Sequence, residues 1–326
     1  MPRVLCTALS TETGPHFELL RSAGFDCEVV DRSLNLWDEQ SLVKAADGYD
    51  AILAGSEPFT EAVLTQLPSL RVLSRTGVGW DAIDAKVCDR LGIVIAITPG
   101  VNHDSVAEHT IALLMGVSRG FPQSDHEVRQ NVWQRVARPR VMSRTLGLVG
   151  LGRIGQAVAW RAIGLGMKVL ACDQAPSADF VASHNVEMVS FDDLLARSDY
   201  VSLHVPVTPE TRHLIDASAI EKMRDGVVII NTARGPLIDE TALISALESG
   251  KVASAGLDVF EEEPLPAESP LLKRQDVLLS GHVAGLDQES HRDTCKMAAE
   301  TIISLHRGDW PGNRIQNLHD RNGWQW

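Results

Sequence analysis

The chain is poor in aromatic residues and carries fewer basic than acidic side chains. Phe, Trp and Tyr account for 5% of its 326 residues, and 30 Lys and Arg stand against 43 Asp and Glu, which gives a formal net charge of −13. An acidic excess of this size disfavours nucleic acid or an anionic membrane as the main partner. We therefore expect a small-molecule ligand, with no nucleic-acid partner and no membrane association.

Cysteines are few and scattered, and long hydrophobic runs are missing. The five cysteines stand at positions 6, 27, 88, 172 and 295 without a Cys-x-x-Cys pair, which is typical of a reducing compartment. No apolar run reaches membrane-spanning length, and a predicted strand begins almost at Met1, which leaves no room for a signal peptide. We therefore expect a cytoplasmic protein.

Two common catalytic signatures are also absent. The sequence has no His-Glu-x-x-His motif and no clustered Cys/His spacing, so we expect no metal site. It also lacks the Gly-x-Ser-x-Gly turn that presents the nucleophile of a Ser-His-Asp hydrolase. These absences direct attention to other kinds of chemistry.

The chain does contain a glycine-rich turn between a predicted strand and a predicted helix. The run Gly150-Leu151-Gly152-Arg153-Ile154-Gly155 follows the apolar segment 146–149. In a dinucleotide-binding unit, such glycines permit the tight turn, the approach of backbone amides to the pyrophosphate and the packing of helix on strand. Asp173, after the next predicted strand, is placed to accept hydrogen bonds from the adenosine ribose hydroxyls. The alternative is a purely structural turn, but strand, helix and acid together predict NAD as the cofactor.

Short apolar runs alternate with helical patterns along most of the chain. Strands are expected at 4–8, 27–30, 51–54, 72–74 and 93–97, and again at 200–205, 227–232, 253–259 and 277–280. Strands joined through helices are parallel, and their crossovers are right-handed, so we expect doubly wound parallel sheets of the α/β class. One helix is expected from about 105 to 118, directly before the dinucleotide unit, and another over 289–305, which could return to the first domain.

Three polar residues stand after consecutive predicted strands, namely Arg234, Glu263 and His282. Ligands of open α/β sheets bind outside the carboxyl ends of the strands, so these side chains are candidates for one crevice. A 2-keto acid that accepts a hydride needs a proton on its oxygen, and His282 is suited to supply it, with Glu263 orienting the imidazole and favouring its protonated form. Arg234 can bind the substrate carboxylate or carbonyl oxygen. The alternatives are an ion-pairing arginine, a solvated acid and a packed histidine.

Further segments carry a family pattern: Arg75 to Asp81, Asn102 to His109 and Ser202 to Pro206. With the glycine turn and the three catalytic candidates, they resemble the D-isomer-specific 2-hydroxyacid dehydrogenases over nearly the whole chain, and within them the short phosphoglycerate dehydrogenase-like branch. The resemblance implies an NAD-dependent oxidoreductase that interconverts a small D-2-hydroxy acid and its 2-keto acid, usually as a homodimer. It also implies a Rossmann domain at 100–285 inserted into a flavodoxin-like substrate domain made of 1–99 and 286–326.

The resemblance also implies roles for single residues. Arg234, Glu263 and His282 match the catalytic triad of the family, and the backbone at Val78 and Gly79 matches its substrate-carboxylate loop. The positions that match residues lining NAD are Val106, Gly150, Gly152, Arg153, Ile154, Gly155, Asp173, His204, Pro206, Thr211, Thr232, Ala233, Asp258, Ala284 and Gly285, with Asp258 near the carboxamide.

The chain departs from the family pattern at two places. Gly281 stands where a proline commonly precedes the catalytic histidine, so the backbone at His282 is expected to be freer. The chain ends soon after Leu318, so we expect no C-terminal regulatory domain, and we expect the terminal tryptophans to pack on the substrate domain. The segment from Arg135 to Arg144 falls where a dimer partner would be contacted.

The substrate is the least determined feature. Arg75 precedes the Val78-Gly79 loop, where a guanidinium could bind a distal phosphate, and this favours 3-phosphoglycerate. The alternative for Arg75 is an interdomain ion pair. Two other functions stay open, a glyoxylate or hydroxypyruvate reductase and an NAD(H)-sensing binding protein of the same fold.

Overall fold

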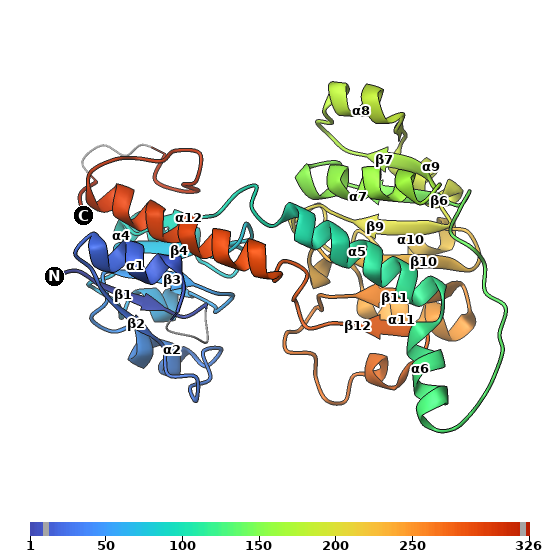
Figure 1. Ribbon diagram of the computed structural model, residues 1–326, viewed down its shortest axis with the longest axis horizontal. Helices are drawn as coiled ribbons and strands as arrows, with labels where there is room; N and C mark the ends of the chain where they lie inside the picture. The colour runs from blue at the N-terminus through green and yellow to red at the C-terminus, as the bar shows by residue number, and fades with distance from the viewer. Residues whose placement is uncertain (9–12, 320–323) are drawn as a thin grey trace. The chain divides into compact units, whose positions relative to one another are not determined.

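The structure, a computed structural model, describes residues 1–8, 13–319 and 324–326. The chain forms two compact units (Figure 1). The first unit consists of Met1–Asn102 together with Leu286–Trp326, and the second of His103–Gly285. Each unit is built on a parallel sheet with helices, which confirms the predicted α/β class.

The first unit has a five-stranded parallel sheet in the order β2-β1-β3-β4-β5, the flavodoxin-like arrangement. Its strands are β1 (Arg3–Cys6), β2 (Asp26–Val29), β3 (Ala51–Ala54), β4 (Val72–Arg75) and β5 (Val94–Ala96). Its helices are α1 (Pro15–Ser22), α2 (Glu39–Ala46), α3 (Glu61–Leu64), α4 (Ala85–Leu91) and α12 (Gln288–His306).

Successive residues of these strands face opposite layers of the core, as the strand period of two requires. On one face Val4 packs with Phe17 of α1 and Ile302 of α12, and on the other Leu5 packs with Leu42 of α2. Helix α12 therefore completes the face that α1 begins, which explains why the C-terminal segment belongs to this unit.

The tryptophan-ended tail also packs on the first unit, as expected from the sequence. The indole Nε1 of Trp324 donates a hydrogen bond of 2.8 Å to the carbonyl oxygen of Gly92. The Trp326 ring lies edge-on to Phe25, with 5.7 Å between the ring centroids.

The second unit has a seven-stranded parallel sheet in the order β12-β11-β10-β9-β6-β7-β8. Counted from β6, this contains the Rossmann order 3-2-1-4-5-6. Its strands are β6 (Thr145–Val149), β7 (Lys168–Cys172), β8 (Glu187–Met188), β9 (Tyr200–Leu203), β10 (Val227–Asn231), β11 (Val252–Leu257) and β12 (Val277–Leu279). Its helices are α5 (His103–Ser118), α6 (Phe121–Arg129), α7 (Arg153–Gly164), α8 (Ala178–His184), α9 (Phe191–Arg197), α10 (Ala217–Lys222) and α11 (Glu240–Ser249), with two 3-10 turns at Gly235–Leu237 and Pro270–Lys273.

Helix α6 was not expected from the sequence. None of its residues is buried, so it has no apolar stripe that periodicity could reveal. The segment 130–140 that follows it is exposed throughout. The two-residue strand β8 was also missed because so short a strand carries no readable alternation.

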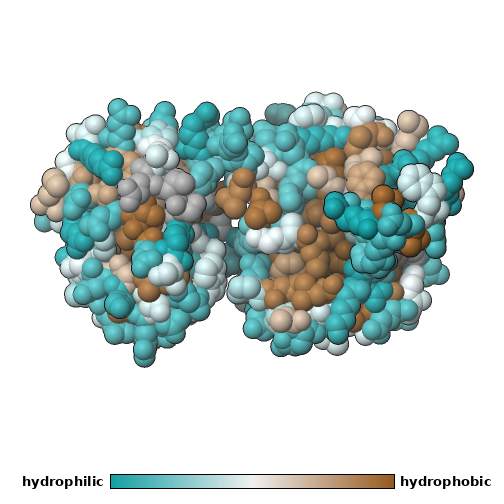
Figure 2. All heavy atoms as spheres, turned by 60° about the horizontal axis from the view of Figure 1, so that its bottom comes forward, coloured by the Kyte–Doolittle hydropathy of each residue, from teal (hydrophilic) through white to brown (hydrophobic). Residues whose placement is uncertain are grey.

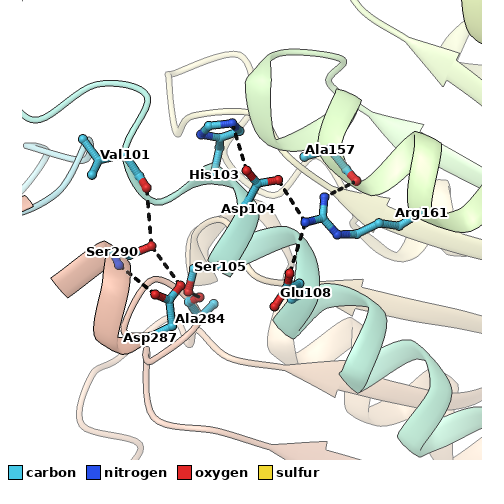
Figure 3. Close-up of polar contacts among 10 residues, drawn as sticks. All are labelled: Val101, His103, Asp104, Ser105, Glu108, Ala157, Arg161, Ala284, Asp287 and Ser290. Carbon is cyan, nitrogen blue, oxygen red and sulfur yellow. Dashed lines mark hydrogen bonds and ion pairs between the residues drawn. The ribbon is translucent and has the colours of Figure 1, made fainter. Parts of the chain in front are cut away.

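The start of α5 is held by polar contacts within the second unit (Figure 3). Arg161 of α7 donates to the carboxylates of Asp104 at 2.9 Å and Glu108 at 3.2 Å, which ties α5 to α7. In the first unit, the Ser290 hydroxyl at the start of α12 lies 2.8 Å from a carboxylate oxygen of the N-cap residue Asp287 and 3.4 Å from the carbonyl of Val101.

The described residues contain neither a membrane-spanning helix nor a metal-binding cluster. No helix there is both long enough and apolar enough to cross a bilayer. Across the same residues, no group of three or more His, Cys, Asp or Glu side chains is arranged to hold a metal ion.

Candidate active site

The glycine turn joins the carboxyl end of β6 to the start of α7. Gly150 has φ +98, and a Cβ atom there would lie 2.6 Å from the carbonyl oxygen of His204, so the turn and its close packing both require glycine. A Cβ at Gly155 would lie 2.2 Å from the carbonyl oxygen of Gly150. At Gly152 a Cβ would meet no protein atom within 4 Å.

Gly152 is also the N-cap residue of α7. Open space at a helix N-terminus, beside amides that have no intrahelical partner, suits an anionic group. The residues present therefore fit the pyrophosphate of a dinucleotide. Arg153 and Ile154 form the first turn of the same helix.

Asp173 follows β7, next to the glycine turn. Its carboxylate accepts hydrogen bonds from the amide of Leu151 at 2.6 Å and from the amide of Ala175 at 2.7 Å. The side chain therefore holds the turn and lies at the strand end where the sequence places the adenosine ribose. The two residues after it, Gln174 and Ala175, carry no positive charge.

Strand β9 pairs with β6 at the point where the strand order reverses, and His204 follows its end. The His204 Nε2 atom lies 2.9 Å from the Ser202 hydroxyl, while Nδ1 is buried with no hydrogen-bond partner in the described chain. Burial lowers the pKa of His204 to about 3, so the ring is neutral at physiological pH.

His282 and Glu263 are brought together as the sequence predicts. His282 Nδ1 lies 2.7 Å from Glu263 Oε2, and the other carboxylate oxygen of Glu263 accepts a hydrogen bond of 3.0 Å from the amide of Phe260. Both oxygens of the carboxylate are thus engaged. The two side chains keep 42% and 31% of their surface exposed, so a small molecule can reach them.

The loop that carries Arg234 is fixed by the last residue of β10. The side chain of Asn231 donates to the carbonyl oxygen of Arg234 at 2.8 Å and accepts from the amide of Ala233 at 3.0 Å. The Arg234 guanidinium donates to the carbonyl of Ala233 at 2.6 Å. A Cβ at Gly235 would lie 1.8 Å from the carbonyl carbon of Phe260, so this loop packs directly on the segment that leads to Glu263.

Asn231 was not singled out from the sequence. Its role depends on two hydrogen bonds to residues two and three positions later. The signal that could have found it is an Asx residue at the end of a strand, immediately before a turn.

Asp258, at the end of β11, is fully buried. Its carboxylate accepts hydrogen bonds from the Ser280 hydroxyl at 2.6 Å and from the amides of Val283 at 3.0 Å and Ala284 at 2.9 Å. Burial raises the pKa of Asp258, but the hydrogen bonds from His109, Ser280 and these amides outweigh it and lower the pKa overall. The family resemblance implies a place for this residue near the nicotinamide carboxamide, which stays a prediction; in the structure its oxygens accept hydrogen bonds from the loop 280–284. His109 and Ser280 were not identified from the sequence.

The other positions expected to line NAD also lie in the second unit. Thr232 follows β10 and pairs with Thr110 of α5, with 2.8 Å between the hydroxyl oxygens. The Thr211 hydroxyl donates to the carbonyl of Pro206 at 2.7 Å. Val106 is buried on α5, and Ala284 and Gly285 follow His282.

Arg75, Val78 and Gly79 belong to the first unit. The Arg75 guanidinium donates from Nε to the carbonyl oxygen of Gly79 at 2.8 Å and from Nη1 to that of Ala54 at 3.3 Å. The Val78 side chain is 42% exposed. The guanidinium therefore links the backbone of the loop that carries Val78 and Gly79 to the end of β3.

The chain is similar to known proteins in both sequence and structure. Residues 111–284 match the family model described as the NAD binding domain of D-isomer specific 2-hydroxyacid dehydrogenases. The glyoxylate reductase of Korarchaeum cryptofilum is 38% identical over 295 residues, which cover 86% of this chain and 89% of that protein.

Two further similarities differ in extent. The D-3-phosphoglycerate dehydrogenase of Archaeoglobus fulgidus is 38% identical over 294 residues, which are 89% of this chain but 55% of that protein, so the chain spans about half of its length. The structure of D-lactate dehydrogenase from Aquifex aeolicus with NAD and lactic acid superimposes with a TM-score of 0.83 at 30% identity, covering 96% of this chain and 98% of the other.

Proposed function

The chain belongs to the D-isomer specific 2-hydroxyacid dehydrogenase family and is an NAD-dependent oxidoreductase. From this premise we propose that it reduces a small, unphosphorylated 2-keto acid to the D-2-hydroxy acid, and the reverse, with Arg234, Glu263 and His282 as its catalytic residues. The single observation that carries the proposal is the 2.7 Å contact between His282 Nδ1 and Glu263 Oε2. The segment that leads to Glu263 packs on the loop that presents Arg234.

NADH, when bound, supplies the hydride. The pyrophosphate would lie at Gly152 and the N-terminus of α7, and Asp173 would accept from the adenosine ribose. With Nδ1 committed to Glu263, the Nε2 atom of His282 is the one that gives a proton to the substrate oxygen during reduction and takes it back during oxidation. Glu263 orients the imidazole through Nδ1, and Arg234 binds the carboxylate or the oxygen that gains charge.

The contacts of Arg75 favour an unphosphorylated substrate. The sequence alone favoured 3-phosphoglycerate because a guanidinium at this position can bind phosphate. In the structure two of its donors bond the carbonyl oxygens of Gly79 and Ala54, which supports a role in shaping the carboxylate loop. The glyoxylate reductases to which this chain is similar match over 89% or more of their length, in agreement with this choice.

The test is NADH oxidation with glyoxylate, hydroxypyruvate and phosphohydroxypyruvate at equal concentrations. We expect turnover with the first two and a markedly lower kcat/KM with the third. The highest kcat/KM with phosphohydroxypyruvate would make 3-phosphoglycerate the substrate instead. Tight NADH binding with no turnover of any 2-keto acid would indicate an NAD(H)-sensing protein of the same fold.

We also propose that two copies associate through the second unit and that the protein is cytoplasmic. Large apolar side chains are exposed on α6, on the segment after it and on α7, among them Phe121 at 61%, Trp133 at 81% and Trp160 at 47%. Figure 2 shows apolar side chains gathered on one face of the second unit. Such a patch is typical of an interface. None of the five cysteines, all within the described residues, forms a disulfide, which agrees with a reducing compartment. Analytical sedimentation tests the association: we expect a dimer for the wild type and a weaker dimer for Trp133→Glu. A monomeric wild type would contradict the proposal.

A further inference from the structure

The backbone at His282 has a conformation that histidine rarely adopts. Its φ is +54, in the left-handed region, which costs a residue with a Cβ about 1 kcal/mol or more. The preceding Gly281 adds no restraint, because a Cβ there would meet nothing within 4 Å. Other contacts must therefore hold the catalytic candidate in place.

Asp258 provides three of these contacts to consecutive residues. The amide of His282 donates to the main-chain carbonyl of Asp258 at 2.7 Å. The amides of Val283 and Ala284 donate to the two carboxylate oxygens of Asp258. One residue at the end of β11 thus binds the amide of the strained residue and of both residues that follow it.

Two side chains of helix α5 form hydrogen bonds with the two ends of the loop 280–284. Near the C-terminal end of the loop, the Ser105 hydroxyl donates to the carbonyl oxygen of Ala284 at 2.7 Å (Figure 3). At the N-terminal end, His109 Nε2 lies 2.8 Å from the Ser280 hydroxyl. Ser105 and His109 are four positions apart, so they lie one above the other on one face of α5.

The direction of the hydrogen bonds links His109 to Asp258. The Ser280 hydroxyl has one proton, which it donates to Asp258 at 2.6 Å, so it accepts from His109 Nε2. His109 Nε2 also lies 3.5 Å from the same carboxylate oxygen. A buried carboxylate needs hydrogen-bond donors on its oxygens. By donating to the Ser280 oxygen, His109 keeps the Ser280 proton directed at Asp258.

We infer that His109 is a positioning residue for His282, acting through Ser280 and Asp258. The inference rests on the proposed function, because His282 must give and take the proton for its position to matter. His109 touches none of the reacting atoms. Its effect is to keep Asp258 in the arrangement that binds the amides of His282, Val283 and Ala284.

The test compares His109→Phe, which removes the donor, with His109→Gln, which keeps an N–H donor of similar reach. Deuterium exchange of the backbone amides in 280–284 is measured in the protein without substrate. We expect exchange at Val283 and Ala284 to rise about tenfold in His109→Phe and to return near the wild-type rate in His109→Gln. Ser280→Ala should show the same rise in exchange at Val283 and Ala284. It takes the place of His109→Phe if His109→Phe does not fold. His184→Gln, on α8, is the matched control and should leave exchange unchanged.

Kinetics give the second readout. In His109→Phe we expect kcat for keto-acid reduction to fall about tenfold while the Kd of NADH stays within about twofold, and His109→Gln to recover most of the loss. Unchanged exchange and unchanged kcat in folded His109→Phe would overturn the inference. If the wild type reduces no keto acid, the proposed function fails, and the exchange rates alone decide whether His109 holds the loop.

Discussion

The two units share a parallel-sheet architecture, and each buries polar side chains that differ in whether they have hydrogen-bond partners. In the second unit, the buried side chains of Asn231 and Asp258 have hydrogen-bond partners, and those partners belong to the loops that carry Arg234 and His282. In the first unit, both ring nitrogens of buried His16 and one carboxylate oxygen of buried Glu57 have no partner in the part of the chain that the structure describes.

The pKa of a buried polar group depends on whether it has hydrogen-bond partners. Burial raises the pKa of Glu57 and lowers that of His16 to about 4, because the charged form of each group is disfavoured away from water. For Asp258 the hydrogen bonds reverse the effect of burial. A buried polar residue whose partners lie in a loop with reactive side chains helps to fix that loop, whereas a buried polar group without a partner lowers stability.

The largest expected effect is on the catalytic candidate of the second unit. His282→Gln should reduce turnover of the keto acid by about two to four orders of magnitude, because proton transfer to the substrate oxygen is lost. NADH binding should stay nearly unchanged, since the glycine turn is not altered. Steady-state kinetics and fluorescence titration of NADH check both parts. Wild-type turnover in this variant would exclude His282 as the acid.

Glu263→Gln should have a smaller effect than His282→Gln. Glu263 lies 2.7 Å from Nδ1 of His282 and so orients the ring with Nε2 left for the substrate. A glutamine side chain can present either its oxygen or its N–H to Nδ1, so it no longer fixes the tautomer and orientation of the imidazole. We expect kcat for keto-acid reduction to fall about tenfold or more while the Kd of NADH stays unchanged. Wild-type kcat in this variant would contradict the pairing of these two residues.

Asp173 should determine the preference of the second unit between NADH and NADPH. Asp173 accepts bonds from backbone amides and has no cation in the two residues after it, so a 2′-phosphate would be repelled. We expect NADH to be preferred over NADPH and Asp173→Ala to narrow the ratio of their kcat/KM values by about tenfold. Gln174→Ala serves as the control. A wild-type preference for NADPH would contradict the assignment.

Substitution of Arg75 tests whether this residue holds the backbone of the substrate-carboxylate loop or binds a substrate phosphate. If its bonds to Gly79 and Ala54 define its role, Arg75→Ala should lower kcat/KM by a similar factor, about tenfold, for glyoxylate, hydroxypyruvate and phosphohydroxypyruvate. A loss confined to the phosphorylated acceptor would instead restore the role that the sequence suggested. Arg75→Lys provides a charge-retaining comparison, because lysine cannot form the same fork.

The sequence predicts what local pattern determines and misses what depends on pairing between elements. All strands of both sheets except β8, and the turn at Gly150, are readable because apolar runs and glycine spacing are local signals. Helix α6 is missed because it buries no residue. His109 and Ser280 are missed because their contacts join α5 to a loop far along the chain. Gly281 shows the same limit, since the absence of proline suggested a free backbone, whereas Asp258 supplies the restraint.

The smallest expected effect is on the stability of the first unit. His16 has an unfolded pKa near 6.5 and a folded pKa lowered to about 4, mainly by burial and further by the charge of His291. Between these pH values the unfolded chain binds a proton that the folded unit does not, so stability falls as pH falls from about 6.5 to about 4. The shift corresponds to about 3 kcal/mol at most.

His16→Phe should remove this acid sensitivity and the burial of two unpaired nitrogens. We expect the variant to unfold at higher urea than the wild type, with a free-energy gain of about 1 kcal/mol near pH 7.5 and a larger gain near pH 5. Urea titrations at the two pH values, followed by the exchange of amides in α1, measure the difference. His319→Phe, which alters an exposed histidine of the same unit, should show no such pH dependence. If the gain is the same at both pH values, His16 titrates normally in the folded unit and its nitrogens are in contact with water.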